Sequence, residues 1–206
     1  NNNVKCCINN LKEVTRLKIA AIAGSNANHS YNRMLLEFIA RHFSDDDIDV
    51  IDIRQVPMFN ENYKGKIPEV VADIDRRVSS ADAVIIASPE YNHSVTSALK
   101  CVIEWLSYEV HPLENKPVMI IGASTHDQGS SRSQVQLRDI LISPGVNAYI
   151  FQNEEFFMSD AANIIDKDGD ITNETTIHFL EKCMREFKHY AKAINRMVAE
   201  KKEAKK

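Results

Sequence analysis

The residues best suited to chemistry in this sequence are short polar side chains in a loop between an apolar run and an amphipathic pattern. They supply hydroxyl and carboxamide groups, and they are Ser25, Asn26, Asn28, Ser30 and Asn32. At a helix N-terminus, free N–H groups and the helix dipole favour an anion. The loop therefore predicts a site for a single phosphate, and capping of the following helix is the structural alternative.

The two commonest phosphate-binding motifs do not fit this loop. A Walker loop would need Gly and Lys at the positions of His29 and Ser30. A dinucleotide-binding loop would need three glycines, whereas Gly24 stands without the other two. The loop thus argues against ATP and against a dinucleotide bound in the Rossmann manner.

The elements that must position this loop alternate along the chain between apolar strands and amphipathic helices. Strands are predicted at residues 17–23, 48–53, 83–87, 117–123 and 146–151. Helices are predicted at residues 31–43, 68–79, 96–108, 131–142 and 174–199. This alternation is typical of βαβ units, so we expect an α/β fold with a five-stranded parallel sheet of order 2-1-3-4-5.

The composition bounds the domain count and the partners. A length of 206 residues suits one domain, predicted over residues 17–199, with an uncertain N-terminal extension (1–16) and a basic tail (200–206). The net charge of −4 gives no basic field for nucleic acid or a membrane surface. No apolar run approaches the roughly 18–20 residues that cross a bilayer. Four cysteines without metal-site or C-x-x-C spacing predict free thiols, no metal and a cytoplasmic location.

Three loops are expected at one edge of the sheet, because a ligand of an open α/β sheet lies beyond the carboxyl ends of its strands. They are residues 24–32, 88–96 and 123–131. The second loop contains SPEYNHS, which offers an aromatic ring and amide groups to a flat heteroaromatic ring, and the third is small and polar. Together the loops predict a nucleotide-like ligand with one phosphate.

These motifs resemble those of the NADPH-dependent FMN reductase family, which includes quinone, azo-dye and chromate reductases. The family pattern G-S-L-R-x-x-S-x-N-R is matched at residues 24–33, and S-P-E-Y-N is intact at residues 88–92. The pattern L-K-x-x-I-[DE]-W-L-S appears at residues 99–107, and the resemblance spans about residues 17–190. It implies a flavodoxin-like three-layer sandwich that binds FMN and uses NADPH or NADH as electron donor.

The resemblance also implies which residues bind the cofactor. They come from the three loops, and they are Ser25, Asn26, Ser30, Asn32, Pro89, Glu90, Tyr91, Asn92, His93, Ser124 and Thr125. The first loop would hold the phosphate, the second would line the isoalloxazine ring, and the third would close its other edge. One position departs from the family pattern, because the arginine that helps to neutralise the phosphate is replaced by Ala27. We expect this change to weaken FMN retention, by tenfold or more.

The implied reaction is electron transfer from NAD(P)H to a quinone, azo dye, metal ion or free flavin in a ping-pong cycle. No side chain is assigned as a catalytic acid or base, because the flavin carries the chemistry. Glu90 is alternatively a structural acceptor or an intersubunit partner, and His93 is alternatively an exposed loop residue. The alternative functions are a flavodoxin-like electron carrier and the flavin domain of a larger redox protein.

The resemblance implies a homodimer or homotetramer whose partner molecule is a small electron acceptor. The helix around Trp105 and residues 89–93 are expected near the subunit interface. Trp105 as a core residue is the alternative.

Overall fold

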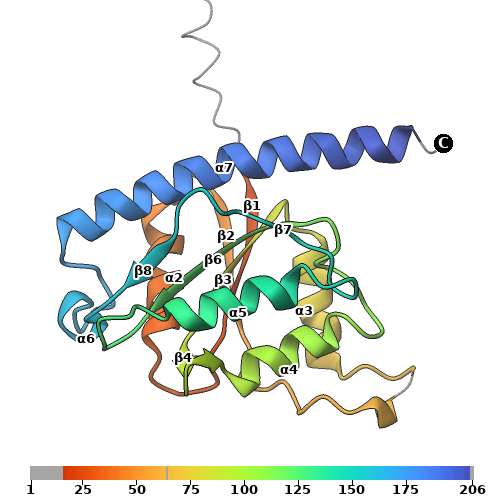
Figure 1. Cartoon of the computed structure of the whole chain (residues 1–206), viewed down its shortest axis with the longest axis horizontal. Helices are drawn as coiled ribbons and strands as arrows, with labels where there is room; N and C mark the ends of the chain where they lie inside the picture. The colour runs from red at the N-terminus through yellow and green to blue at the C-terminus, as the bar shows by residue number, and fades with distance from the viewer. Residues whose placement is uncertain (1–15, 64, 205–206) are drawn as a thin grey trace, which may run out of the picture.

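The computed structural model of this chain describes residues 16–63 and 65–204 (Figure 1). The predicted N-terminal extension therefore lies outside the described residues, except for Arg16. The described elements are, in chain order, β1 (Lys18–Ala23), α2 (Tyr31–His42), β2 (Asp47–Asp52), the 3-10 helix η1 (Glu61–Tyr63), α3 (Glu69–Ser79), β3 (Ala83–Ala87), β4 (Glu90–Tyr91), β5 (Ser94–Val95), α4 (Ser97–Trp105), β6 (Pro117–Ala123), α5 (Ser131–Leu141), β7 (Tyr149–Ile150), β8 (Phe156–Met158), α6 (Ala161–Ile164) and α7 (Glu174–Glu203).

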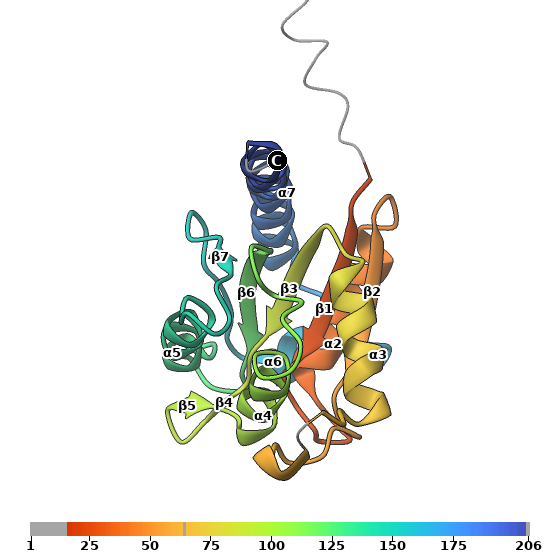
Figure 2. The same cartoon turned by 90° about the vertical axis from the view of Figure 1, so that its right-hand side faces the viewer.

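The parallel sheet has strand order β2-β1-β3-β6-β7, which confirms the predicted fold class and order. Helices cover both of its faces, and α7 runs along one face and past its edge (Figures 1 and 2). Alternate residues of β1 explain the three layers. Ile19 and Ala21 pack in the core that holds α2 and α7, whereas Ala20 and Ile22 pack in the core of α3, α4 and α5. A strand buried on both faces is apolar throughout, as this one is.

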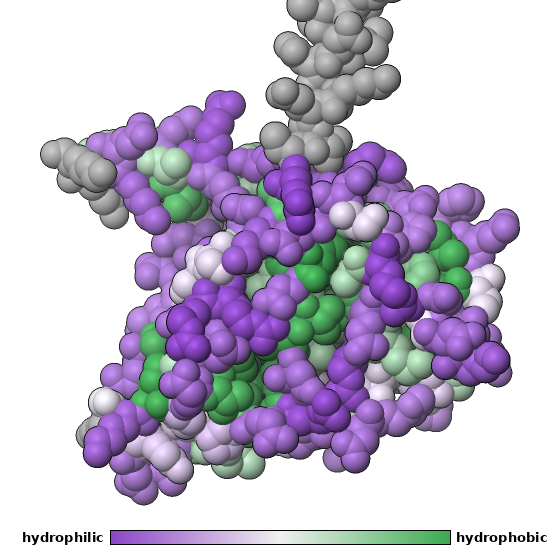
Figure 3. All heavy atoms as spheres, turned by 180° about the vertical axis from the view of Figure 1, so that it is seen from behind, coloured by the Kyte–Doolittle hydropathy of each residue, from purple (hydrophilic) through white to green (hydrophobic). Residues whose placement is uncertain are grey.

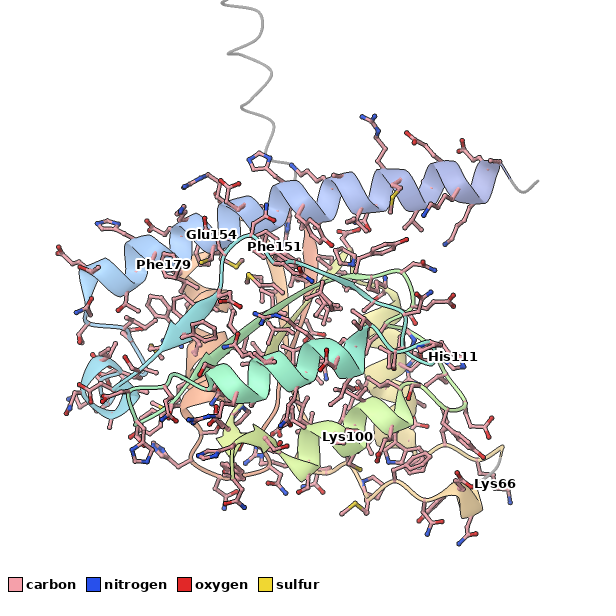
Figure 4. The ribbon with its side chains drawn as sticks, in the orientation of Figure 1. Lys66, Lys100, His111, Phe151, Glu154 and Phe179 are labelled. Carbon is pink, nitrogen blue, oxygen red and sulfur yellow. The ribbon has the colours of Figure 1, made fainter. Side chains whose placement is uncertain are left out.

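The prediction of one fifth strand over residues 146–151 is wrong in detail. The structure divides that position between β7 and β8, which pair with opposite ends of β6. The segment between them turns toward α7, where Phe151 packs on Phe187 at 5.7 Å between ring centroids and Glu154 forms an ion pair with Lys182 at 2.7 Å (Figure 4). Phe151 still donates its N–H to the Val118 carbonyl of β6 at 2.8 Å, and the pairing with β6 resumes at Phe156.

Two further boundaries differ from the sequence prediction. The second loop contains the short hairpin β4-β5, whose turn residues Asn92 and His93 have φ of 51° and 62°. Positive φ at both turn residues is the mark of a tight type I′ turn, and Asn tolerates it well. Helix α7 continues to Glu203, so residues 200–203 of the expected tail are helical.

No described helix is both long and apolar enough to cross a membrane. Hydrophilic side chains cover most of the face seen from behind, and apolar side chains are visible near its middle (Figure 3). Trp105, in α4, is almost completely buried, and its indole N–H donates to the Pro57 carbonyl at 2.8 Å. Trp105 is therefore part of the core, the alternative considered from the sequence.

A buried carboxylate ties the beginning of β1 to α7. Asp46 accepts hydrogen bonds from the Leu17 N–H at 3.0 Å and from the Lys188 ammonium at 2.6 Å. Its side chain is 1% exposed, and that of Lys188 is 12% exposed. Breaking such a pair leaves a charge without its partner.

We therefore expect Asp46→Ala to lower the free energy of unfolding by about 3 kcal/mol. Urea unfolding followed by circular dichroism measures this change. The control is Asp45→Ala, because Asp45 is exposed in the same turn and surface substitutions usually change stability by less than about 0.5 kcal/mol. Equal effects of the two substitutions would contradict the role given to Asp46.

Candidate functional site

A cavity of about 260 Å³ lies where the carboxyl ends of β1, β3 and β6 meet their loops. All three loops predicted to bind the ligand contribute to its wall. The lining residues are Ser25, His29, Ser30, Tyr31, Asn32, Pro89, Glu90, Tyr91, Ala123, Ser124, Thr125 and His126.

Most of the predicted cofactor residues line this cavity, but three do not. Asn26 lines a neighbouring hollow of about 90 Å³, together with Arg54 and Cys101. Asn92 and His93 form the exposed turn of the β4-β5 hairpin. The sequence reasoning left out four lining residues, His29, Tyr31, Ala123 and His126. These four residues lie inside or next to the three polar loops, and this position in the sequence could have identified them.

Gly24 joins the first loop to β3 and to the second loop by one backbone and one side-chain hydrogen bond. The Gly24 N–H donates to the Ala87 carbonyl at 2.9 Å, and the Thr96 hydroxyl donates to the Gly24 carbonyl at 2.7 Å. A Cβ at position 24 would lie 2.7 Å from the Ala87 oxygen. The missing side chain therefore lets the ends of β1 and β3 approach closely.

The beginning of α2 presents unpaired backbone donors beside the cavity. Ser30 is the N-cap, and its hydroxyl oxygen accepts a hydrogen bond from the Arg33 N–H at 3.3 Å. Within the described part of the chain, the N–H groups of residues 29–32 have no hydrogen-bond acceptor. The first N–H groups of a helix lack intrahelical partners and favour an anion. Capping and ligand binding are thus compatible at this loop.

Asn32 joins the first loop to the third. Its carboxamide donates to the Ala123 carbonyl at 2.8 Å and accepts from the Ala123 N–H at 2.9 Å. The side chain is buried, so its oxygen and one of its two N–H bonds are used inside the protein. Asn32 therefore positions the cavity wall.

Arg33 supports the first loop on the side away from the cavity. Its Nη2 donates to the carbonyls of Ala27 at 2.8 Å and Asn28 at 2.6 Å, and its Nη1 lies 4.0 Å from a carboxylate oxygen of Asp52. Arg54 also pairs with Asp52 and, chiefly through its hydrogen bond, lowers the pKa of that carboxyl. The side chain of Arg33 is only 11% exposed.

Glu90 supports the opposite wall. Its carboxylate accepts from the N–H groups of Arg132 at 2.9 Å and Ser133 at 3.3 Å, at the beginning of α5. The N-cap residue of that helix, Ser130, has φ of 71° and makes no side-chain cap. Glu90 supplies this cap from another element, which matches the structural role considered from the sequence, although it also lines the cavity.

The third loop contacts the second through small residues. Ser88 and Ser133 are fully buried, and their hydroxyl oxygens lie 2.7 Å apart in a hydrogen bond. A Cβ at Gly122 would overlap the hydroxyl of Ser130 at 1.7 Å. Ser124 accepts from the His126 N–H at 3.1 Å, which shapes the rim. Small side chains thus bring β6 and its loop against the start of α5.

The resulting site suits a flat ligand that carries one anionic group. Unpaired N–H groups gather at the first loop, and Pro89 and Tyr91 offer ring surfaces on the second. Among the described residues, no group of three or more His, Cys, Asp or Glu could hold a metal ion. The donor set therefore fits the phosphate and ring of FMN.

Comparisons with known proteins find relatives of this chain and solved structures of the same fold. The chain is 37% identical over 181 residues to the NADH:(hydroxy)cinnamate reductase subunit CrdA of Vibrio ruber, covering 87% of this chain and 90% of the relative. It is 35% identical over 177 residues to the NADH-dependent flavin reductase subunit 2 of Lactobacillus johnsonii, covering 83% and 95% of the two chains. The flavoenzyme FerB, an NAD(P)H:(acceptor) oxidoreductase from Paracoccus denitrificans, shares the fold with a TM-score of 0.71 at 24% identity, covering 89% and 98%.

The profile of one enzyme family matches most of the domain, over residues 17–163. Its description, NADPH-dependent FMN reductase, confirms at the level of the family the predicted oxidoreductase class and the FMN and NAD(P)H cofactors. With this profile match, the relatives and the cavity geometry in agreement, the chain belongs to the NADPH-dependent FMN reductase family.

Proposed function

We propose that this chain binds FMN in the 260 Å³ cavity and transfers electrons from NADH or NADPH to a small-molecule acceptor. The observation that carries the proposal is the meeting of three loops around unpaired N–H groups at the beginning of α2. Bound FMN supplies the chemistry, since it accepts a hydride and passes electrons on. The protein binds it, orients it and shapes access to it.

The proposed contacts follow the cavity wall. The phosphate would be held by Ser25, Ser30 and the N–H groups of residues 29–32. Residues 89–91 would line the ring, and Ser124 and Thr125 would close its edge. Asn32 would act by holding the loop to β6, while Asn26, Asn92 and His93 lie outside the cavity.

We also propose a ping-pong cycle. NAD(P)H and the acceptor would use the same open face of the flavin in turn, so each would bind after the other has left.

The names of two relatives help to rank the possible electron acceptors. The proposed acceptors are a quinone, an azo dye, a metal ion or free flavin, and the name of the Lactobacillus relative favours free flavin. The name of the Vibrio relative adds an aromatic acid of the cinnamate type. Turnover with each acceptor in parallel would rank them.

The assembly has two candidates. We propose a homodimer or homotetramer, as the family resemblance implies. Both named relatives are subunits, which favours as a second candidate a complex with a different chain. Sedimentation of the FMN-loaded chain distinguishes a self-associating protein from a monomer that awaits its partner.

We also propose a cytoplasmic location. Cys101 and Cys183 are free and buried, as expected of thiols in a reducing compartment. Burial raises the pKa of both thiols, and that of Cys183 to about 12, so neither is an activated nucleophile.

Kinetics distinguish the proposed enzyme from an electron carrier. Under anaerobic conditions, NADH or NADPH alone should bleach the FMN-loaded protein, and steady-state data with an acceptor should give parallel double-reciprocal lines. Stopped-flow absorbance and initial rates measure the two properties, and free FMN without protein is the control. Flavin that stays oxidised in excess NADH and NADPH would exclude the enzyme in favour of the carrier.

The support given by Arg33 predicts a loss of affinity without a direct ligand contact. Arg33→Met should raise the Kd of FMN by about tenfold to a hundredfold, because it removes two hydrogen bonds that hold the loop. Flavin fluorescence titration measures the Kd. Arg41→Met is the matched control, since Arg41 lies on the same helix and bonds to Gly169 and Asp170 away from the cavity. Equal changes in Kd would show a general loss of stability instead.

A further inference from the structure

We infer that the imidazolium of His29 is the cationic partner of the flavin phosphate, so that the contribution of His29 to cofactor retention is lost as pH rises. This inference rests on the proposed binding of FMN in the 260 Å³ cavity. It adds a residue that the family-based assignment did not contain, and a regulation of the same site.

Few side chains around the cavity can supply a positive charge to the negatively charged phosphate. None of its described lining residues is Lys or Arg. The titratable side chains in the wall are His29, Tyr31, Glu90, Tyr91 and His126. The carboxylate of Glu90 is already bonded to the beginning of α5, and the tyrosines carry no positive charge. A positive side-chain charge in this wall therefore has to come from a histidine.

Three arginines near the cavity do not line it. The Nη2 of Arg33 donates to two carbonyls of the first loop, while its buried Nη1 has no hydrogen-bond partner among the described residues and lies 4.0 Å from Asp52. Arg54 pairs with Asp52 at 2.5 Å, and Arg132 lies 3.4 Å from Glu90 of the cavity wall. The charges of these arginines stay constant over the range in which histidine titrates.

His29 is better placed than His126 to meet the phosphate. It directly precedes the N-cap Ser30 and lies in the stretch whose N–H groups are unpaired. Its ring packs edge-on against Tyr31, with centroids 4.9 Å apart and an interplanar angle of 80°. Both residues line the cavity, so His29 lies beside the N–H groups proposed to bind the anion. His126 belongs to the third loop, expected at the ring edge.

The sign of the pH dependence follows from the charge of the imidazole. Histidine loses its positive charge between about pH 5 and 8, where a phosphate monoester is an anion. The protonated ring attracts the phosphate and the neutral ring does not. The contribution of His29 to FMN affinity should therefore be largest in the lower part of this range and fall as pH rises.

The test compares FMN with riboflavin, which lacks the phosphate, on the full chain and its His29→Gln variant. Kd values are measured by fluorescence titration between about pH 5.5 and 8.5, around the histidine range. At the acidic end, the variant should bind FMN roughly three- to tenfold more weakly than the unchanged chain. The difference should vanish at the basic end and be absent for riboflavin. Comparing two proteins cancels the titration of the phosphate itself.

His126→Gln is the matched control, because it removes the other histidine of the same cavity. It should leave the phosphate-dependent difference in place. The same pH profile for the unchanged chain and His29→Gln, an equal loss with riboflavin, or a phosphate-dependent loss only in His126→Gln would each overturn the inference. If FMN binds and the profiles coincide, this inference alone fails. If the unchanged chain binds neither flavin, the proposed function fails with it.

Discussion

The carboxamide of Asn32 is the contact on which the site depends, because it joins a loop after β1 to the end of β6. Its two hydrogen bonds to Ala123, of 2.8 and 2.9 Å, cross 91 positions of sequence. They hold the unpaired N–H groups of α2 beside the third loop. Buried, paired polar groups of this kind fix one arrangement, because a shift would leave each of them without a partner.

The other supports of the cavity have the same character. Thr96 joins the first and second loops through Gly24, and Glu90 joins the second loop to the beginning of α5. Arg33 holds two carbonyls of the first loop. Some polar side chains that the sequence analysis assigned to ligand binding thus form hydrogen bonds within the cavity wall instead. What remains for an anion is mainly backbone N–H and neutral side chains, with histidine as the source of positive charge.

The strand order was predictable because the alternation of apolar strands and amphipathic helices leaves few topologies for a parallel sheet. Boundaries that depend on distant contacts were not. After Phe151, whose N–H still bonds to β6, the chain runs past α7, where Phe151 contacts Phe187 and Glu154 pairs with Lys182. Nothing local in the segment indicates these partners. The β4-β5 hairpin was hidden for a related reason, since two-residue strands are too short to show a period.

The sequence by itself determined the family, the fold class and the three loops, because motif spacing and apolar patterning are local properties of the chain. It also placed Ser25, Ser30, Pro89, Tyr91, Ser124 and Thr125 in the loops that the structure gathers into one cavity. Only the tertiary structure decided which polar groups remain available there. The carboxamide of Asn32 and the carboxylate of Glu90 are engaged, Asn26 and the hairpin turn lie outside, and His29 and His126 line the wall. Whether a polar group is engaged depends on hydrogen-bond partners that lie far away in the sequence. Local sequence patterns do not identify those partners.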